Sequence, residues 1–304
     1  MNRPSYGDVT AEYRALRNGV AVVESTHDLV LVEGPDAASF LQGILSQDIE
    51  SMIPGEVARS FLLNPSGKLT ALLWVLRGSE RVGLFTDAGL GATVVESLNY
   101  FRIRVKAEVS LDERTTWALI GPEAESLLEV GERWTERNDS ILAPAPLVGL
   151  PRVLVAGDLP VSGLPRAGSI AMTSVRVEAG EPVMNLDVDE KTIPQETGLV
   201  PASVSFTKGC YLGQELVARI DSRGHVNRNL RGIVMTRNVL PPEGAEVWLG
   251  DRMCGTLTSV SESLGVMAPI ALCLLRREVE PDAEIEVRWD AASTPAIARE
   301  LPLL

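Results

Sequence analysis

The amino-acid sequence predicts an α+β protein that carries an all-β module at its C-terminus. Strand-like and helix-like segments mix through residues 1–229, without the strict alternation of a doubly wound parallel sheet. From about Leu230 the apolar segments become short, and turns such as Pro241–Gly244 separate them. A succession of short apolar segments separated by turns is typical of a small antiparallel barrel or sandwich. A length of 304 residues suits about two domains, or three small ones.

The composition is that of a globular protein with an acidic balance of charge. Hydrophobic residues make up 45% and charged residues 23% of the sequence. This composition excludes an intrinsically disordered protein, because disordered chains have few apolar residues. The 28 Lys and Arg against 41 Asp and Glu give a net charge of −13. We therefore expect no direct binding of nucleic acid through the overall field.

Cysteine usage and apolar runs indicate the compartment. Cys210, Cys254 and Cys273 lie far apart without a CxxC pair, which favours a reducing cytoplasm over a disulfide framework or a zinc knuckle. The sequence has only two histidines as candidate imidazole ligands, so no resident metal is expected. Leu69–Leu76 is far shorter than the roughly 20 residues of a membrane helix, and the first residues lack the apolar core of a signal peptide. We expect a cytoplasmic protein with no membrane partner.

The sequence contains a faint internal repeat. Leu31–Leu41 and Leu119–Leu128 each read as a short strand, a Gly-Pro turn and a helix that begins near an acidic residue. One interpretation is that Gly-Pro-acid is simply a common helix start. The other is that two similar β-α units pack against each other with a cleft between them.

Further elements follow from local patterns. Ser60–Leu63 and Lys68–Leu76 predict a hairpin around the polar turn Asn64–Gly67. The spacing of apolar residues predicts a helix over 92–101 and a strand over Ile103–Val109. Residues 144–165 are rich in Pro and Gly, but their apolar runs favour short strands over a linker.

The densest feature for chemistry is the segment Thr207–Ile220. Alternation over Ser203–Phe206 predicts a strand before it, and the spacing of Leu216, Val217 and Ile220 predicts a helix after it. Its two glycines let the backbone approach a ligand closely. The helix start and Lys208 would both favour the thiolate of Cys210. The alternative is an ordinary small apolar cysteine beside a surface pair of Glu215 and Arg219.

Charge is unevenly distributed around this segment. Residues 205–237 hold six Lys or Arg and two acids, a local charge of +4 in a chain of −13. Such a basic island suits an anionic small molecule better than a polymer. The alternative is a solvated face with no ligand.

Lys208–Glu215 matches the pattern K-G-C-Y-x-G-Q-E, and in this it resembles the YgfZ-type folate-binding proteins. The resemblance extends through Arg176–Gly180 and Ile193–Glu196, while Gly198-Leu199 departs from the expected Asn-Leu. It implies the aminomethyltransferase-like three-part α+β fold, in which interleaved α+β units surround a central channel that a C-terminal antiparallel β-barrel caps. The expected folate-binding region is 1–229, divided into 1–50 with 140–229 and 51–139, and the expected barrel domain is 230–304.

The resemblance also implies the function and its residues. The protein would bind tetrahydrofolate and assist the assembly or repair of iron–sulfur clusters in client enzymes, including radical enzymes that modify transfer RNA. Its partners would be folate and iron–sulfur client proteins or assembly factors. Cys210 and Lys208 would carry the chemistry; since four thiolates usually hold a cluster, Cys210 would need a partner. The expected cofactor-binding residues of the motif are Gly209, Tyr211, Gly213, Gln214, Glu215 and Arg219.

Glu178 is the expected pterin ligand. A pterin presents an amino group and a ring N–H side by side, and one carboxylate can accept both. The matching glutamate of the related aminomethyltransferases has this role, so the resemblance carries it to Glu178. The alternative is a salt bridge between Glu178 and Arg176.

One feature argues against aminomethyl transfer. The related aminomethyltransferases place a catalytic aspartate just beyond the turn that matches Asn64–Gly67, but here Lys68–Leu73 contains no carboxylate. Whether the protein is an enzyme at all stays open. One rival function is a folate-dependent one-carbon transferase with its acid elsewhere, at Glu178 or Asp48; the other is a scaffold with a vestigial folate site.

Overall fold

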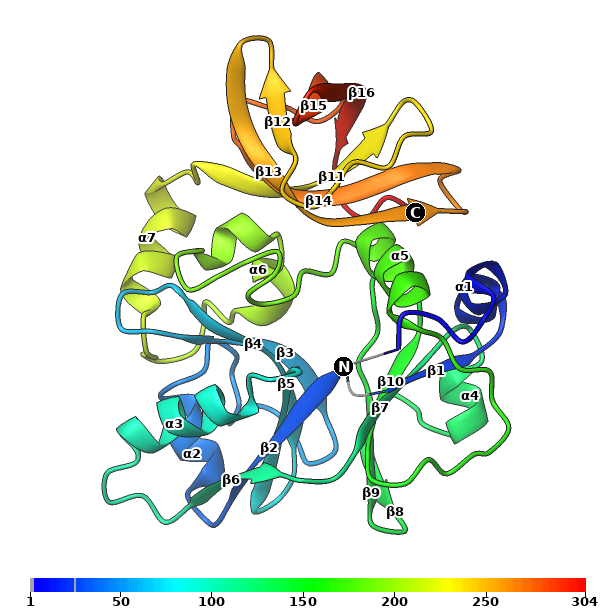
Figure 1. Cartoon of the computed structure of the whole chain (residues 1–304). Helices are drawn as coiled ribbons and strands as arrows, with labels where there is room; N and C mark the ends of the chain where they lie inside the picture. Colours follow the sequence, from blue (N-terminus) through cyan, green and yellow to red (C-terminus); the bar gives the residue numbers. More distant parts are fainter. Residues whose placement is uncertain (1–2, 25) are drawn as a thin grey trace.

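Three groups of strands make up the structure, a computed structural model that describes residues 3–24 and 26–304 (Figure 1). Two groups are five-stranded antiparallel sheets, and the third is a closed six-stranded barrel. Figure 1 shows the two sheets next to each other, with the barrel across one end. Among the described helices, none is long and apolar enough to cross a membrane.

The first sheet has the strand order β3-β4-β5-β2-β6 and comes from one stretch of chain. The predicted hairpin is confirmed, because β3 and β4 pair antiparallel across the Asn64–Gly67 turn with Phe61 opposite Leu72. The predicted helix 92–101 is also confirmed, as α3. The elements of this stretch are β2 (His27–Glu33), α2 (Ala37–Gln42), β3 (Val57–Leu63), β4 (Leu69–Arg77), β5 (Arg81–Asp87), α3 (Gly91–Phe101) and β6 (Glu108–Asp112).

The predicted strand Ile103–Val109 is wrong over residues 103–107, since β6 begins at Glu108. Ile103 is 76% exposed, and Arg104 has a left-handed φ of 58°. Pairing of β6 with β2 begins only at Glu108. The alternation of apolar residues imitates a strand here, but a left-handed residue breaks the extended backbone that strand pairing needs.

The second sheet has the strand order β1-β7-β10-β9-β8 and encloses the first in sequence. Only β1 precedes the first sheet, and the other strands follow it. Strand β10 lies inside the Pro- and Gly-rich stretch 144–165, where short strands were predicted. The elements are α1 (Val9–Asn18), β1 (Ala21–Glu24), β7 (Thr116–Ile120), α4 (Ala124–Leu128), β8 (Thr135–Arg137), β9 (Ser140–Pro144), β10 (Arg152–Ala156) and α5 (Ser169–Ala179).

The Gly-Pro repeat marks the same turn in both sheets. Gly34 follows β2 and precedes α2, and Gly121 follows β7 and precedes α4. Their φ angles are 136° and 138°, and a Cβ atom would lie 2.4 Å from the Lys106 carbonyl oxygen and 2.2 Å from the Gly19 carbonyl oxygen. Only glycine allows this combination of positive φ and close backbone contact. The structure therefore favours two similar β-α units over a chance resemblance.

Apolar side chains from both sheets form one core cluster. Leu29, Leu76 and Phe85 of the first sheet are buried in it together with Ile120 and Leu154 of the second. Burial of apolar surface contributes roughly 25 cal/mol per Å² to folding. The two sheets are therefore held together by a shared core.

The C-terminal module is a closed barrel, which decides between the predicted barrel and sandwich. Its strand order is β11-β14-β13-β12-β15-β16, and β16 pairs back onto β11. Closure leaves no free sheet edge for aggregation. The strands are β11 (Arg228–Met235), β12 (Glu246–Leu249), β13 (Arg252–Ser263), β14 (Ala268–Arg276), β15 (Glu284–Trp289) and β16 (Ala292–Arg299).

Between α5 and the barrel the chain has little regular structure, namely the 3₁₀ helix η1 (Pro194–Thr197), α6 (Val200–Ser203) and α7 (Gln214–Arg223). The division into 1–229 and 230–304, with subdomains 1–50 with 140–229 and 51–139, stays a prediction. Sheet membership follows other bounds: β2 lies in the sheet of β3–β6, and β7 and β8 lie in the sheet of β1.

Candidate functional site

Residues 208–213 of the motif form an irregular loop, and its last two residues, Gln214 and Glu215, begin α7. The helix begins at Gln214, directly after Gly213, as the sequence predicts. The predicted strand Ser203–Phe206 is wrong, because α6 ends at Ser203 and Phe206 is 49% exposed. Alternation of Val204 and Phe206 with serines imitates a strand, but Val204 is a helix C-cap. The motif therefore joins two helices.

Lys208 anchors this loop to the turn that follows α2. Its ammonium donates to the carbonyl oxygens of Gln42, Leu45 and Gln47 at 2.7, 2.7 and 2.8 Å, and lies 5.2 Å from the centre of the Tyr211 ring. Burial lowers the pKa of Lys208 to about 8. All three N–H donors of the ammonium are used, so the side chain is held at this turn.

Two glycines bring the loop against the β3–β4 hairpin. Gly213 has a φ of 75°, and a Cβ atom on it would lie 2.7 Å from the Asn64 carbonyl oxygen. Gly67, in the hairpin turn, has a φ of 78°, and its Cβ would lie 2.6 Å from the Leu216 Cβ. Gly209 has no atom within 4 Å of an ideal Cβ, so no contact demands glycine there.

Of the remaining motif residues, some are buried in the protein and others are exposed on its surface. Tyr211 is buried, which raises its pKa to about 12, and its backbone N–H donates to Gln214 Oε1 at 3.2 Å. Arg219 and Glu215 form an exposed i,i+4 ion pair at 2.7 Å. Cys210 is exposed, whereas Cys254 and Cys273 are buried. The thiol predicted to react is thus the accessible one of the three.

Glu178 lies in the last turn of α5, and its side chain contacts α1 and the barrel strand β13. Its carboxylate is fully buried and accepts hydrogen bonds from Tyr13 Oη at 2.7 Å and Arg17 Nε at 2.8 Å, with Ser263 Oγ as a third donor. Its ion-pair partner is Arg17, and Arg176 pairs with Asp187 instead. Both carboxylate oxygens are therefore engaged by the protein itself, and the pterin role of Glu178 stays a prediction.

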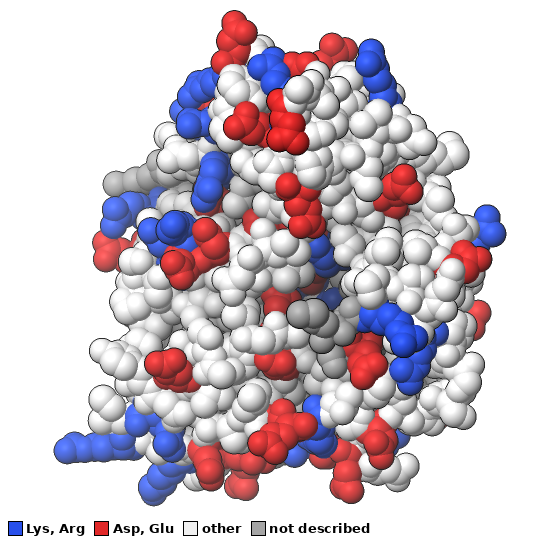
Figure 2. Space-filling view, in the orientation of Figure 1, with Lys and Arg blue, Asp and Glu red and all other residues white. Residues whose placement is uncertain are grey.

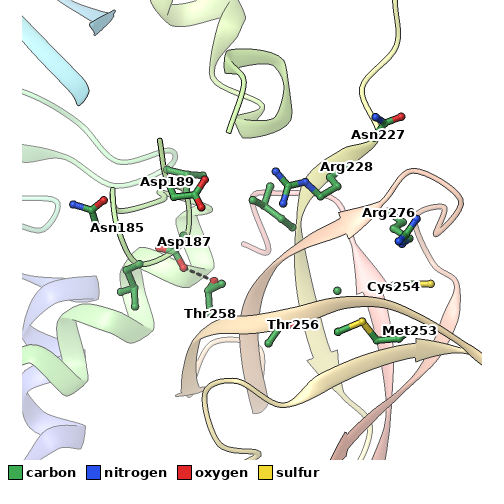
Figure 3. Close-up of a pocket in the computed structure, with 14 residues that line it drawn as sticks. Asn185, Asp187, Asp189, Asn227, Arg228, Met253, Cys254, Thr256, Thr258 and Arg276 are labelled. Carbon is green, nitrogen blue, oxygen red and sulfur yellow. Dashed lines mark hydrogen bonds between the residues drawn. The ribbon is translucent and has the colours of Figure 1, made fainter. Parts of the chain in front are cut away.

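A cavity of about 550 Å³ lies between the barrel and the turn that follows α5 (Figure 3). Asp187 and Asp189 line it from the turn, and Arg228 and Arg276 line it from the barrel strands β11 and β14. Apolar side chains of Val188, Met253 and Leu274 complete part of its wall. Carboxylates, guanidinium groups and apolar surface together suit a flat polar molecule with an anionic end. Sequence reasoning missed this cavity, because its residues come from four separate segments, within 185–189, 227–228, 253–258 and 274–276.

Asp187 fixes the turn to the barrel. Its carboxylate accepts hydrogen bonds from Arg176, Thr258 and Ser259, each at 2.6 Å, and from the Val183 N–H at 3.0 Å. Figure 3 shows the bond to Thr258. The arginine of the Arg176–Gly180 stretch is thus a structural partner of the cavity wall.

A second, smaller cavity of about 20 Å³ lies between strands of the first sheet and the segment that follows α5. Its polar lining includes His27, Arg59, Asp87 and Glu181, and Arg59 pairs with Glu181 at 2.7 Å. Burial lowers the pKa of His27 well below its usual value and raises that of Asp87 to about 7. Leu72 lines this cavity, at the place where a carboxylate is absent from β4. This volume holds about one water molecule.

Three basic residues of the island 205–237 are engaged within the protein. Lys208 is buried against carbonyl groups, Arg219 pairs with Glu215, and Arg228 pairs with Glu196 at 2.9 Å. On the face seen in Figure 2, Lys and Arg side chains lie among Asp and Glu side chains. In the part of the chain that the structure describes, no group of three His, Cys, Asp or Glu is placed to hold a metal ion.

Comparison with family models matches both ends of the chain. The model described as the GCVT N-terminal domain matches residues 2–143, and that of the glycine cleavage T-protein C-terminal barrel domain matches residues 228–304. The second match coincides with the closed barrel.

Individual relatives cover nearly the whole chain. The aminomethyltransferase of Rubrobacter xylanophilus is 27% identical, over 98% of this chain and 86% of that protein. The tRNA-modifying protein YgfZ of Edwardsiella ictaluri is 28% identical, over 86% of each. The crystal structure of glycine cleavage system aminomethyltransferase T from Bartonella henselae superposes with a TM-score of 0.88, over 97% of this chain and 89% of that chain at 20% identity. The predicted three-part fold is confirmed.

Proposed function

This chain belongs to the glycine cleavage T-protein superfamily, within which it is of the YgfZ type, and from that premise we propose that it binds a reduced folate. The observation that carries the proposal is the cavity of about 550 Å³ between the turn after α5 and the barrel. This volume is within the range of small-molecule sites, which is roughly 300–1,000 Å³.

The chemistry of the cavity supports tetrahydrofolate as the ligand. The pterin end of a folate presents adjacent N–H donors, and its glutamate end carries carboxylates. Asp189 faces the cavity as a candidate acceptor for the pterin, and Arg276, exposed in β14, as a candidate donor to a carboxylate. Apolar surface from Met253 and Leu274 would cover the flat rings.

Glu178 remains the rival pterin acceptor. Accepting a pterin would require Glu178 to give up Tyr13 or Arg17, which already occupy its oxygens. Breaking such a buried pair costs about 3–5 kcal/mol. Asp189 accepts hydrogen bonds from the Lys191 N–H and the Thr192 hydroxyl at one oxygen, Oδ1, whereas both oxygens of Glu178 are engaged, so the cavity carboxylate is the better candidate.

Titration with tetrahydrofolate under oxygen-free conditions tests the proposal. We expect binding to the wild-type protein, loss of about tenfold or more in affinity for Asp189→Asn, and near-normal affinity for a folded Glu178→Gln variant. The reverse order would make Glu178 the pterin ligand. No binding to the wild-type protein at high micromolar folate would favour a scaffold with a vestigial site.

We further propose that the folate-bound protein assists assembly or repair of iron–sulfur clusters in client enzymes, among them enzymes that modify transfer RNA. The tRNA-modifying relative and the exposed thiol of Cys210 support this proposal. A single thiolate cannot hold a cluster alone, so a client protein or assembly factor would supply the remaining ligands. The cytoplasm is the compartment proposed for it.

A folate-dependent one-carbon transferase is the second candidate, and the aminomethyltransferase relatives favour it. Against it stands β4, where Thr70, Ala71 and Leu72 offer no carboxylate near the turn. Of the two sites suggested for a displaced acid, Glu178 is buried in its own network, and Asp48 accepts a bond from Gln42 Nε2 in the turn that Lys208 anchors. Turnover of aminomethyl donors with tetrahydrofolate would decide for the transferase.

A further inference from the structure

The loop between α3 and β6 presents two large apolar side chains to solvent. Tyr100 and Ile103 are 77% and 76% exposed. Apart from Met267, every other large apolar side chain that the structure describes is at most 51% exposed. Phe101 and Val105, which alternate with Ile103, pack instead against the core of the first sheet. The loop is therefore anchored on one side and carries unpartnered apolar surface on the other.

Hydrogen bonds hold this loop in one shape. Arg102 Nε donates to Asn99 Oδ1 at 2.9 Å, and its Nη1 donates to the Ala107 carbonyl oxygen at 2.7 Å. The Lys106 backbone N–H donates to Asp36 Oδ2 at 2.8 Å. Because both ends of the loop are tied, its exposed side chains stand on a fixed backbone, and little conformational entropy is lost when a partner binds.

The loop is also cationic. Residues 99–107 hold Arg102, Arg104 and Lys106 and no acidic residue, a local charge of +3 in a chain of −13. Arg104 and Lys106 are exposed, and neither forms an ion pair with another described residue, the acidic residues that flank the loop included. Lys and Arg side chains project at the lower left of the face in Figure 2, where Figure 1 places the loop between α3 and β6.

We propose that the segment Tyr100–Lys106 is a docking surface for an acidic segment of a partner protein that also carries apolar side chains. Tyr100 and Ile103 bury against the apolar side chains of that segment, and Arg104 and Lys106 pair with its carboxylates. Tyr and Arg are among the residue types that dominate the binding energy of protein interfaces. The surface is small, so the contact is transient, and it does not depend on folate binding.

The charge of the whole chain favours a short acidic segment over other polyanions. Since −13 includes the +3 of the loop, the rest of the chain carries −16 and repels an extended anionic surface such as RNA or a membrane. Recognition of anionic lipids typically uses roughly four to eight clustered cations, and this loop holds three. A short peptide segment contacts the loop alone and avoids the acidic remainder.

Photo-cross-linking with the full chain tests the proposal. The purified protein carries p-benzoylphenylalanine in place of Ile103 and is irradiated in an extract of the cells that normally make it. We expect a cross-link to a protein, attached within a segment that holds more Asp and Glu than Lys and Arg. Met267 is the matched control position, because it is highly exposed and has a φ of 56°, but residues 260–270 hold no cation.

A double variant, Arg104→Asn with Lys106→Gln, removes charge without changing the backbone. Arg104 has a left-handed φ of 58°, which asparagine tolerates. We expect the cross-link at position 103 to fall about fivefold or more in this variant. A synthetic copy of the captured segment should bind the wild-type chain and lose about tenfold in affinity for the variant, while the circular dichroism melting curve stays unchanged.

Four results would each overturn the proposal. They are a cross-link at position 103 no stronger than that at position 267, attachment to lipid or RNA, a captured segment without an excess of acidic residues, and equal binding of that segment to the folded double variant.

Discussion

Gly67 and Gly213 contact each other backbone to backbone: a Cβ atom on Gly213 would lie 2.9 Å from the Gly67 Cα, and one on Gly67 would lie 2.8 Å from the Gly213 carbonyl oxygen. The hairpin turn of the first sheet and the start of α7 meet at this point. Two segments far apart in the sequence therefore both need glycine, because their backbones contact each other at this point.

We expect Gly213→Ala to destabilise the protein by about 2 kcal/mol or more. The left-handed φ alone costs roughly 1–2 kcal/mol for alanine, and the new methyl group would meet the hairpin. Urea denaturation followed by circular dichroism measures the change. Gly209→Ala, with open space around its Cβ position, is the control and should stay within about 0.5 kcal/mol of the wild-type protein. Equal stability of the two variants would show that the backbone contact is unimportant.

Glu178→Gln should lower the free energy of unfolding by about 2–4 kcal/mol. It leaves the Arg17 guanidinium without its carboxylate in a largely buried position. Thermal and urea unfolding check this value, and a double-mutant cycle with Arg17→Met isolates the pair. A variant as stable as the wild-type protein would mean that the pair contributes little, and the buried carboxylate would then need another explanation.

Cys210 should react with maleimide at neutral pH well before the other two thiols. It is exposed, whereas Cys273 is buried and its pKa is raised to about 12, so it stays a protonated thiol up to high pH. Mass spectrometry of partially labelled protein gives the order. Labelling of Cys254 or Cys273 in native protein at a similar rate would contradict the burial of the barrel thiols.

Cys210→Ser should bind tetrahydrofolate almost normally and fail to support cluster-dependent enzymes in cells. The substitution removes an exposed thiol and leaves the cavity untouched, and a hydroxyl group is a poor ligand for soft metals. Activity of a tRNA-modifying iron–sulfur enzyme in a strain that depends on this protein is the measurement, with Cys273→Ser as control. Full support by Cys210→Ser would leave the thiol without a function.

No glycine-cleavage aminomethyl transfer is expected from the wild-type protein, even when the other components are supplied. Thr70, Ala71 and Leu72 leave the folate nitrogen without an acid at the place where the related transferases have one. Formation of methylene-tetrahydrofolate is the assay, and an active aminomethyltransferase is the positive control. Turnover above background would revive the transferase candidate.

Features that depend on neighbouring residues could be predicted from the sequence. The hairpin around Asn64–Gly67, the helix after Gly213 and the Gly-Pro turns each follow from a local pattern of polarity and turn residues. The short strand pattern after Leu230 likewise predicted the barrel or sandwich, but closure is a long-range pairing of β11 with β16 that no local pattern contains.

Partners far apart in the chain could not be predicted. Glu178 meets Tyr13 across 165 residues, and Lys208 meets Leu45 across 163. The sequence identifies Glu178 and Lys208 as candidate functional residues. It does not show whether each charged side chain binds a ligand or a distant part of the protein.

The interleaving of the two sheets has a consequence for synthesis on the ribosome. Strands β2–β6 emerge in succession within residues 27–112, so the first sheet can complete its pairing early. Strand β1 emerges before them, yet its partner β7 begins only at Thr116, with Ala21 opposite Ile120. Because domains form from the N-terminus as the chain grows, we expect β1 to wait unpaired while a whole sheet is built after it. An edge strand in that state is the part of the nascent chain most in need of a chaperone.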